Sequence, residues 1–157
     1  MRKQRIYVDT SVLGGCFDPE FEMWSNGLID DFRKGRFRLV LSDVTAAEIE
    51  HAPEPVRELH AELLSIAELL PVREEALDVL AAYERHGILS PRFRNDMLHI
   101  ALATIAEVDV LVSWNFRHVV RLDKIQKFNG ANLELGYKTL AIYSPREVTT
   151  HEREDTD

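Results

Sequence analysis

The chain has 157 residues, 45% of them hydrophobic, which suits a single domain with one sizeable core. Its 19 lysines and arginines are outnumbered by 27 acidic residues, so a net charge of -8 argues against non-specific binding to a polyanion. No apolar run approaches the roughly 20 residues needed to cross a bilayer, and the only cysteine, Cys16, excludes an internal disulfide or a cysteine-based zinc cluster. We therefore expect a soluble, cytoplasmic protein without a membrane segment.

The charges are unevenly distributed along the chain. The last residues, HEREDTD, lack apolar periodicity, so we predict one folded domain over 1–148 and a disordered acidic tail over 149–157. Basic residues form three clusters, each of which is typical of a solvated face when taken alone. These clusters are Arg2, Lys3 and Arg5; Arg33, Lys34, Arg36 and Arg38; and Arg117, Arg121, Lys124 and Lys127.

The first half of the chain alternates between strand and helix patterns. The opening segment RIYVDTSVLGG predicts a strand that stops at Asp9 and is followed by a turn. Apolar residues at spacings of three and four predict an amphipathic helix over 21–34, ended by Gly35. The segment RFRLVLSD predicts a second strand, and a helix containing VTAAEIEHA follows it until prolines interrupt the pattern.

The second half continues the alternation. We predict a helix over 56–66, a short strand at LLPV, and a helix over 74–86 closed by Gly87. The segment SPRFRNDMLHIALATIAEV predicts a largely buried helix, and DVLVSWN after it predicts a strand covered on both faces. LDKIQKFNGANLELGY is ambiguous between helix and loop, and KTLAIYS predicts the last strand. This order favours a three-layer α/β/α sandwich with a central, mostly parallel sheet.

Four side chains that carry oxygen are predicted to meet at one edge of this sheet. Asp9 and Asn115 stand at the carboxyl ends of two strands, where sites form in such sheets. Glu48 lies about one turn into the helix after the second strand, and Asp96 lies near the start of the buried helix. Gathering three carboxylates costs several kcal/mol of repulsion and desolvation unless a cation is bound. Mg²⁺ or Mn²⁺ prefers such oxygens and can activate a water molecule to attack a phosphodiester.

Each of the four residues also has an ordinary explanation. Asp9 alone is typical of a turn or a helix cap, and Glu48 of an exposed helix position. Asp96 alone is an N-terminal helix charge or a partly buried acid, and Asn115 alone is a turn residue. The set of four, in this order, is what indicates a site.

The segments that carry these residues resemble the PIN-domain family. IYVDTSVLGG resembles its first motif, SDVTAAEIE the helix with its acid, NDMLHIALA its third motif and LVSWNFRHV its fourth, over about residues 5–148. The resemblance implies a parallel sheet between helices and Mg²⁺- or Mn²⁺-dependent RNA hydrolysis. Many small members are VapC-like toxins of toxin–antitoxin pairs, which implies an antitoxin partner and a homodimer.

Carried over by motif, the metal-binding acids are Asp9, Glu48 and Asp96, and Asn115 holds the fourth place. Many members have Asp there, whereas an amide can still ligate or orient a metal-bound water but adds no negative charge. We therefore expect weaker metal affinity, and leave open whether one or two ions bind. Ser113 matches a small hydroxyl position of the family and is a candidate partner for Asp9 or a phosphate.

Histidines stand three residues after three of these positions, at His51, His99 and His118. Glu-x-x-His is also a di-iron pattern, but that site needs a four-helix bundle, which the alternating strands argue against. We interpret His99 as a packed core histidine rather than a partner of the acids. His118 is a candidate phosphate contact.

Cationic side chains around the same edge are candidates for gripping an RNA backbone, with binding that weakens steeply with salt. They are Arg92 and Arg94 before Asp96, and Arg117, His118 and Arg121 after Asn115.

Two alternatives remain at this point. An aspartyl phosphatase also begins with Asp at the end of strand one, but it usually has a second acid two residues later, where this chain has Ser11. A catalytically weak module that binds RNA or a protein partner is the other, and the neutral Asn115 favours it. The sequence specifies neither the RNA target nor the cleaved bond.

Overall fold

The computed structural model describes residues 2–151, and within them the chain forms one sheet of five parallel strands. The strands are β1 (Arg5–Val8), β2 (Arg38–Ser42), β3 (Glu68–Leu70), β4 (Val110–Val112) and β5 (Ala141–Tyr143). Their order across the sheet is β3-β2-β1-β4-β5, so β1 lies in the centre with Tyr7 paired to Val40 on one side and Leu111 on the other.

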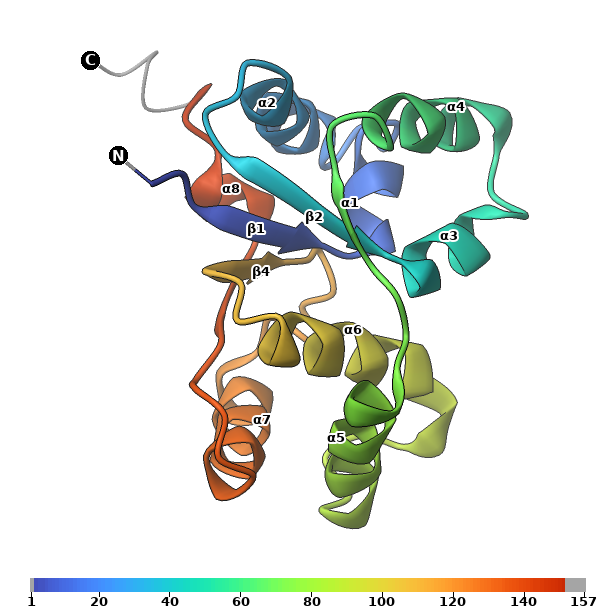
Figure 1. Cartoon of the computed structure of the whole chain (residues 1–157). Helices are drawn as coiled ribbons and strands as arrows, with labels where there is room; N and C mark the ends of the chain where they lie inside the picture. Colours follow the sequence, from blue (N-terminus) through green and yellow to red (C-terminus); the bar gives the residue numbers. More distant parts are fainter. Residues whose placement is uncertain (1, 152–157) are drawn as a thin grey trace.

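Helices cover both faces of this sheet. They are α1 (Thr10–Gly15), α2 (Glu22–Arg33), α3 (Asp43–Ile49), α4 (Glu54–Leu63), α5 (Glu74–Arg85), α6 (Arg94–Ile105), α7 (Leu122–Glu134) and α8 (Pro145–Val148), with a 3₁₀ turn, η1 (Pro91–Phe93), before α6. Figure 1 shows α1, α2 and α4 on one side of the strands and α5, α6 and α7 on the other. This arrangement confirms the predicted three-layer α/β/α sandwich. Over residues 2–151, every helix is too short or too polar to cross a membrane.

The core is divided by the sheet because successive strand residues point to opposite faces. On β1, Ile6 and Val8 pack against the α1, α2 and α4 layer, whereas Tyr7 packs against the α5, α6 and α7 layer. All three side chains are fully buried. The α6 helix is buried continuously from Met97 to Thr104, as its apolar sequence predicts.

Three local predictions were wrong or incomplete. The segment after β1 is a helix rather than a turn, because Asp9 accepts a hydrogen bond from the Ser11 backbone N–H and so caps α1. The ambiguous segment at 122–137 is helical through Glu134, and Asn129 within it uses its side chain to bond both backbone groups of Leu140. The short α8 was not predicted.

The chain after α8 is anchored to α2 by a buried carboxylate. Asp31 accepts hydrogen bonds from Thr149 Oγ1 at 3.0 Å and from Thr150 N at 3.0 Å, and it pairs with Arg36 at 2.9 Å. Thr149 is 2% exposed, so the folded part extends beyond the predicted boundary at residue 148. The remainder of the predicted acidic tail, 152–157, lies outside the described residues.

We expect Gly15→Ala to destabilise the protein by about 1–3 kcal/mol, because overpacking a filled core has this cost. A Cβ at this position would lie 2.6 Å from both Ser25 Oγ and Trp114 Nε1, which are themselves hydrogen-bonded at 2.7 Å. Urea unfolding followed by tryptophan fluorescence measures the change. Gly14→Ala is the matched control, since nothing lies within 4 Å of its added Cβ. Equal stability of the two variants would contradict this packing.

Candidate active site

Asp9 is held at the carboxyl end of the central strand. Its backbone N–H donates to Val112 O at 3.2 Å, which ties it to β4, and its side chain accepts from Ser11 Oγ at 2.5 Å and Ser11 N at 3.1 Å. Only 5% of the residue is exposed. The same Ser11 Oγ accepts from Trp114 N at 2.9 Å. Ser11 therefore bonds both the Asp9 side chain and the segment after β4.

Glu48 reaches the site from α3, which lies at the carboxyl edge of the sheet beside α1 and α6. Its Oε1 accepts hydrogen bonds from Thr10 Oγ1 at 2.9 Å and from His99 Nε2 at 2.6 Å. His99 is 3% exposed, and its Nδ1 lies 2.5 Å from Tyr7 Oη. The prediction that His99 is only a packed core histidine was therefore incomplete, because the buried ring directly contacts one of the acids.

Asp96, in the first turn of α6, meets Asn115 beyond the end of β4. Asn115 Nδ2 donates to Asp96 Oδ2 at 3.3 Å. The Asn115 oxygen accepts from the backbone N–H groups of Arg117 at 3.2 Å and His118 at 2.9 Å, and two such donors identify that atom as the oxygen. The fourth position therefore turns its NH₂ group toward the acids, and its oxygen would have to leave both donors before it could ligate a metal ion.

Ser113 supports the site from within the sheet. The residue is fully buried, and its Oγ accepts from Asn115 N at 2.9 Å and lies 3.5 Å from Ser11 Oγ. A fully buried hydroxyl cannot meet a phosphate. Of the two predicted roles of Ser113, the structure favours the one as a partner of Asp9.

The pKa values of the three carboxylates are shifted in different directions by their surroundings. Burial raises the pKa of Asp9, an effect that His99 and hydrogen bonds from Ser11 and Ser113 partly oppose. Burial, followed by the charge of Asp9, raises the pKa of Asp96 to about 6. Burial alone would raise the pKa of Glu48 too, but the hydrogen bond and charge of His99, with further bonds from Thr10 and Asn95, lower it.

This set of donors suits a hard divalent cation. Carboxylate oxygens are the ligands preferred by Mg²⁺ and Mn²⁺, and a cation would offset the burial and the charge of Asp9 that together raise the pKa of Asp96. As they stand, no three His, Cys, Asp or Glu side chains within residues 2–151 are close enough together to hold an ion. Asp9, Glu48 and Asp96 match the cation in chemistry, and binding would require their side chains to move closer together.

The predicted cationic residues separate into two groups. The Arg92 guanidinium lies 5.7 Å from the Phe93 ring centre, and the His118 ring packs on Phe93 at 3.9 Å. Arg94 instead pairs with Glu84 of α5 at 3.1 Å and is engaged away from the acids.

Positive charge is concentrated around His118. Partial burial lowers the pKa of His118, and the nearby charges of Arg117, Lys124, Arg121 and Arg92 lower it further. Residues of one basic cluster of the sequence thus gather with Arg92 around one side chain, three residues after Asn115. We call this group of cations, with His118 at its centre, the cationic rim; within it, Arg121 also pairs with Asp123 at 2.7 Å.

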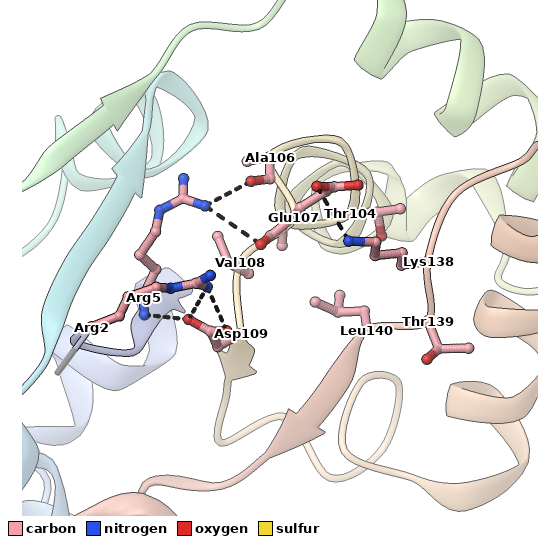
Figure 2. Close-up of a pocket in the computed structure, with 11 residues that line it drawn as sticks. Arg2, Arg5, Thr104, Ala106, Glu107, Val108, Asp109, Lys138, Thr139 and Leu140 are labelled. Carbon is pink, nitrogen blue, oxygen red and sulfur yellow. Dashed lines mark hydrogen bonds and ion pairs between the residues drawn. The ribbon is translucent and has the colours of Figure 1, made fainter.

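A cavity of about 580 Å³ lies at the opposite edge of the sheet, before β1, β4 and β5 begin. Figure 2 shows that Arg2 is joined to Asp109 and Lys138 to Glu107, while the Arg5 guanidinium reaches backbone oxygens. Arg2 bonds Asp109 at 3.0 Å, and Arg5 bonds the carbonyl oxygen of Ala106 at 2.8 Å. Because these charges already have partners and none of the predicted acids lines it, we assign this cavity no part in the candidate active site.

Four residues of the network around the acids were missed in the sequence: Tyr7, Thr10, Ser11 and Ser42. Tyr7 and Ser42 lie within strand patterns, which carry no sign of a polar contact between them. For His99, the signal was its spacing of three residues after Asp96, together with its polar character in an apolar helix.

Comparison of the whole structure with solved structures shows which fold this is. The chain is similar to a chain of VapBC2 from Rickettsia felis bound to a DNA fragment from its promoter, with a TM-score of 0.57 and 13% identity, over 90% of this chain and 98% of that one. It is also similar to a chain of FitAcB from Neisseria gonorrhoeae, with a TM-score of 0.58 and 17% identity, over 91% and 99% of the two chains. The chain has a PIN-like fold.

A chain of FitAB bound to an IR36 DNA fragment gives the same result, with a TM-score of 0.58 and 16% identity, over 89% of this chain and 94% of that one. No protein-family model and no curated protein sequence matches the chain. The likeness is therefore one of structure, and it confirms the PIN-like fold expected from the four motifs.

We expect Asp96→Asn to stabilise the metal-free protein at pH 8 by about 1 kcal/mol and to change its stability little at pH 4. The raised pKa means that the folded state holds this proton more tightly than the unfolded state. Stability contributed by Asp96 is therefore present below about pH 4 and is lost as the pH rises toward about 6. Urea unfolding in EDTA at both pH values measures the difference.

Asp78→Asn, an exposed acid on α5, is the control for this comparison and should have the same small effect at both pH values. A loss of stability in Asp96→Asn at pH 8 would show that the carboxylate is not under repulsion.

Proposed function

We propose that this PIN-like protein is a divalent-metal-dependent endoribonuclease that hydrolyses RNA phosphodiester bonds. The observation that carries the proposal is the placement of Asp9, Glu48 and Asp96 at one sheet edge, where burial and then the charges of Asp9 and Glu48 raise the pKa of Asp96. Carboxylates whose pKa values are perturbed by burial and by neighbouring charges cluster at functional sites. The PIN-like fold supports the same conclusion by analogy.

Each residue of the site is assigned a role from its contacts. Asp9, Glu48 and Asp96 would hold Mg²⁺ or Mn²⁺, and Asn115 holds Asp96 through its amide. When bound, the ion supplies Lewis acidity that activates water and stabilises the leaving oxygen. Ser11 and Thr10 keep Asp9 and Glu48 in place through hydroxyl donors.

The cationic rim is proposed to bind the RNA substrate. The backbone N–H groups of Arg117 and His118 bond Asn115, and Arg92 lies near His118, so this rim is where we propose that the phosphates of the substrate bind. This local charge answers the objection raised by the net charge of -8, because a polyanion would contact the rim rather than the average surface.

We further propose that the protein is the toxin of a toxin–antitoxin pair, with an antitoxin as partner and a homodimer as the assembly. The similar chains belong to VapBC2 and FitAB, whose names describe two-component complexes. The neutral amide of Asn115 favours a second candidate, a catalytically weak module that binds RNA or a protein partner.

Asp9→Asn should lower RNA cleavage by about 100-fold or more, the size of loss typical when a group that stabilises the transition state is removed. The measurement uses end-labelled RNA with Mn²⁺, with and without EDTA, and circular dichroism to show that the variant is folded. Asp78→Asn is the control and should cleave like the wild type. RNA binding by the wild type without EDTA-sensitive cleavage would favour the binding module instead.

Asn115→Asp should strengthen Mn²⁺ binding by about tenfold, because it adds a negative charge next to Asp96. Without metal, the same change should lower the stability at pH 8, since it adds repulsion. Calorimetric titration with Mn²⁺ and urea unfolding in EDTA measure the two effects. Asn115→Ser, which can still accept from the backbone of the following turn, should show neither the gain in affinity nor the added repulsion. Unchanged affinity in Asn115→Asp would place the fourth position outside the metal site.

A further inference from the structure

A row of hydrogen-bonded side chains runs from inside the core to Glu48. Ser42 Oγ lies 2.7 Å from Tyr7 Oη, and His99 Nδ1 lies 2.5 Å from the same Tyr7 oxygen. His99 Nε2 then reaches Glu48 Oε1 at 2.6 Å. Ser42, Tyr7 and His99 are each at most 4% exposed. Polar groups this deeply buried are unfavourable unless they are all hydrogen-bonded, and in this row each of them is.

The direction of the hydrogen bonds follows from the acceptor at the end. An ionised carboxylate can only accept hydrogen bonds, so His99 Nε2 carries a proton and its N–H donates a hydrogen bond to Glu48. The other ring nitrogen is held by the Tyr7 hydroxyl, and the two rings meet edge to face at 5.6 Å. With both nitrogens engaged and the ring packed, the imidazole cannot turn without losing contacts.

Glu48 is consequently held in place by several donors. Its Oε1 accepts from both His99 and Thr10, which come from different elements, and with a further hydrogen bond from Asn95 these donors restrict the rotation of the carboxylate group. An unrestrained glutamate side chain has several rotamers, and ordering it has a cost in entropy. In this structure that cost is met on folding, before any ligand binds.

We propose that His99, supported by Tyr7, is a positioning residue that presents Glu48 to the divalent cation. The proposal rests on the proposed metal-dependent function and extends it to two residues of the core. Groups that hold a metal-binding carboxylate from behind typically change metal affinity or activity by about 10- to 100-fold when removed. The rest of the buried stretch of α6 is apolar except for Thr104, so packing alone does not require an imidazole at position 99.

The test compares two amides of different reach. In His99→Gln, the amide can donate to Glu48 as Nε2 does, whereas in His99→Asn the shorter amide can meet Tyr7 but not Glu48. We expect Mn²⁺ affinity in calorimetric titration to fall by about 10- to 100-fold in His99→Asn and to stay within about threefold in His99→Gln. Tyr7→Phe, which removes only the hydroxyl, should lie between them.

A purely structural role for His99 gives a different result, because both amides would then alter stability and affinity to a similar extent. Urea unfolding of each variant provides this comparison. Equal Mn²⁺ affinity in His99→Asn and His99→Gln, in proteins that are folded, would overturn the proposal.

Metal-free crystal structures separate this proposal from the proposed function. We expect the Glu48 carboxylate to keep its place in His99→Gln and to turn away in His99→Asn. A wild type that binds Mn²⁺ but cleaves no RNA would end the ribonuclease proposal and leave the affinity comparison decisive for His99. If the wild type binds no Mn²⁺, the crystal structures decide, and an unmoved Glu48 in His99→Asn would overturn the positioning role.

Discussion

Repulsion among carboxylates that share one sheet edge is the constraint around which this part of the molecule is organised. The three carboxylates, Asp9, Glu48 and Asp96, come from different elements, and their stabilising partners differ. Asp9 is supported by hydroxyl donors from Ser11 and Ser113, and Glu48 by the imidazole of His99. Asp96 accepts a hydrogen bond from the neutral amide of Asn115, and burial followed by the charge of Asp9 raises its pKa to about 6.

The parallel sheet makes this gathering of acids possible. Because all five strands run the same way, the carboxyl ends of β1 and β4 lie side by side, and Asp9 donates its backbone N–H to the last residue of β4. Helices α3 and α6 then bring Glu48 and Asp96 to the same edge from either side. Ser11 joins these parts, since it bonds both Asp9 and the backbone after β4.

The neutral side chain of Asn115 has two opposing electrostatic effects on the site. Asn115 uses its oxygen to shape the turn that leads to Arg117 and His118, and its NH₂ group to hold Asp96. One residue therefore connects the acids to the cationic rim that follows. Less repulsion in the metal-free protein is the benefit of an amide here, and weaker attraction for a cation is its cost.

The amino-acid sequence by itself determined the strands, most of the helices and the edge at which Asp9, Glu48, Asp96 and Asn115 meet, because local periodicity and strand ends are read directly from residue order. It could not reveal that Asn115 turns its amide nitrogen toward Asp96, or that Arg94 pairs away from the acids with Glu84. Those outcomes depend on partners 19 and 10 residues away, whose positions only packing decides.

The largest difference between sequence and structure concerns His99. Its spacing after Asp96 was visible, but its partners Tyr7 and Glu48 lie 92 and 51 residues away in the chain. A buried histidine in an apolar helix has the same sequence pattern whether it only fills space or holds a carboxylate. The tertiary structure decided between these two roles, because hydrogen bonds depend on distance and direction, which residue order does not contain.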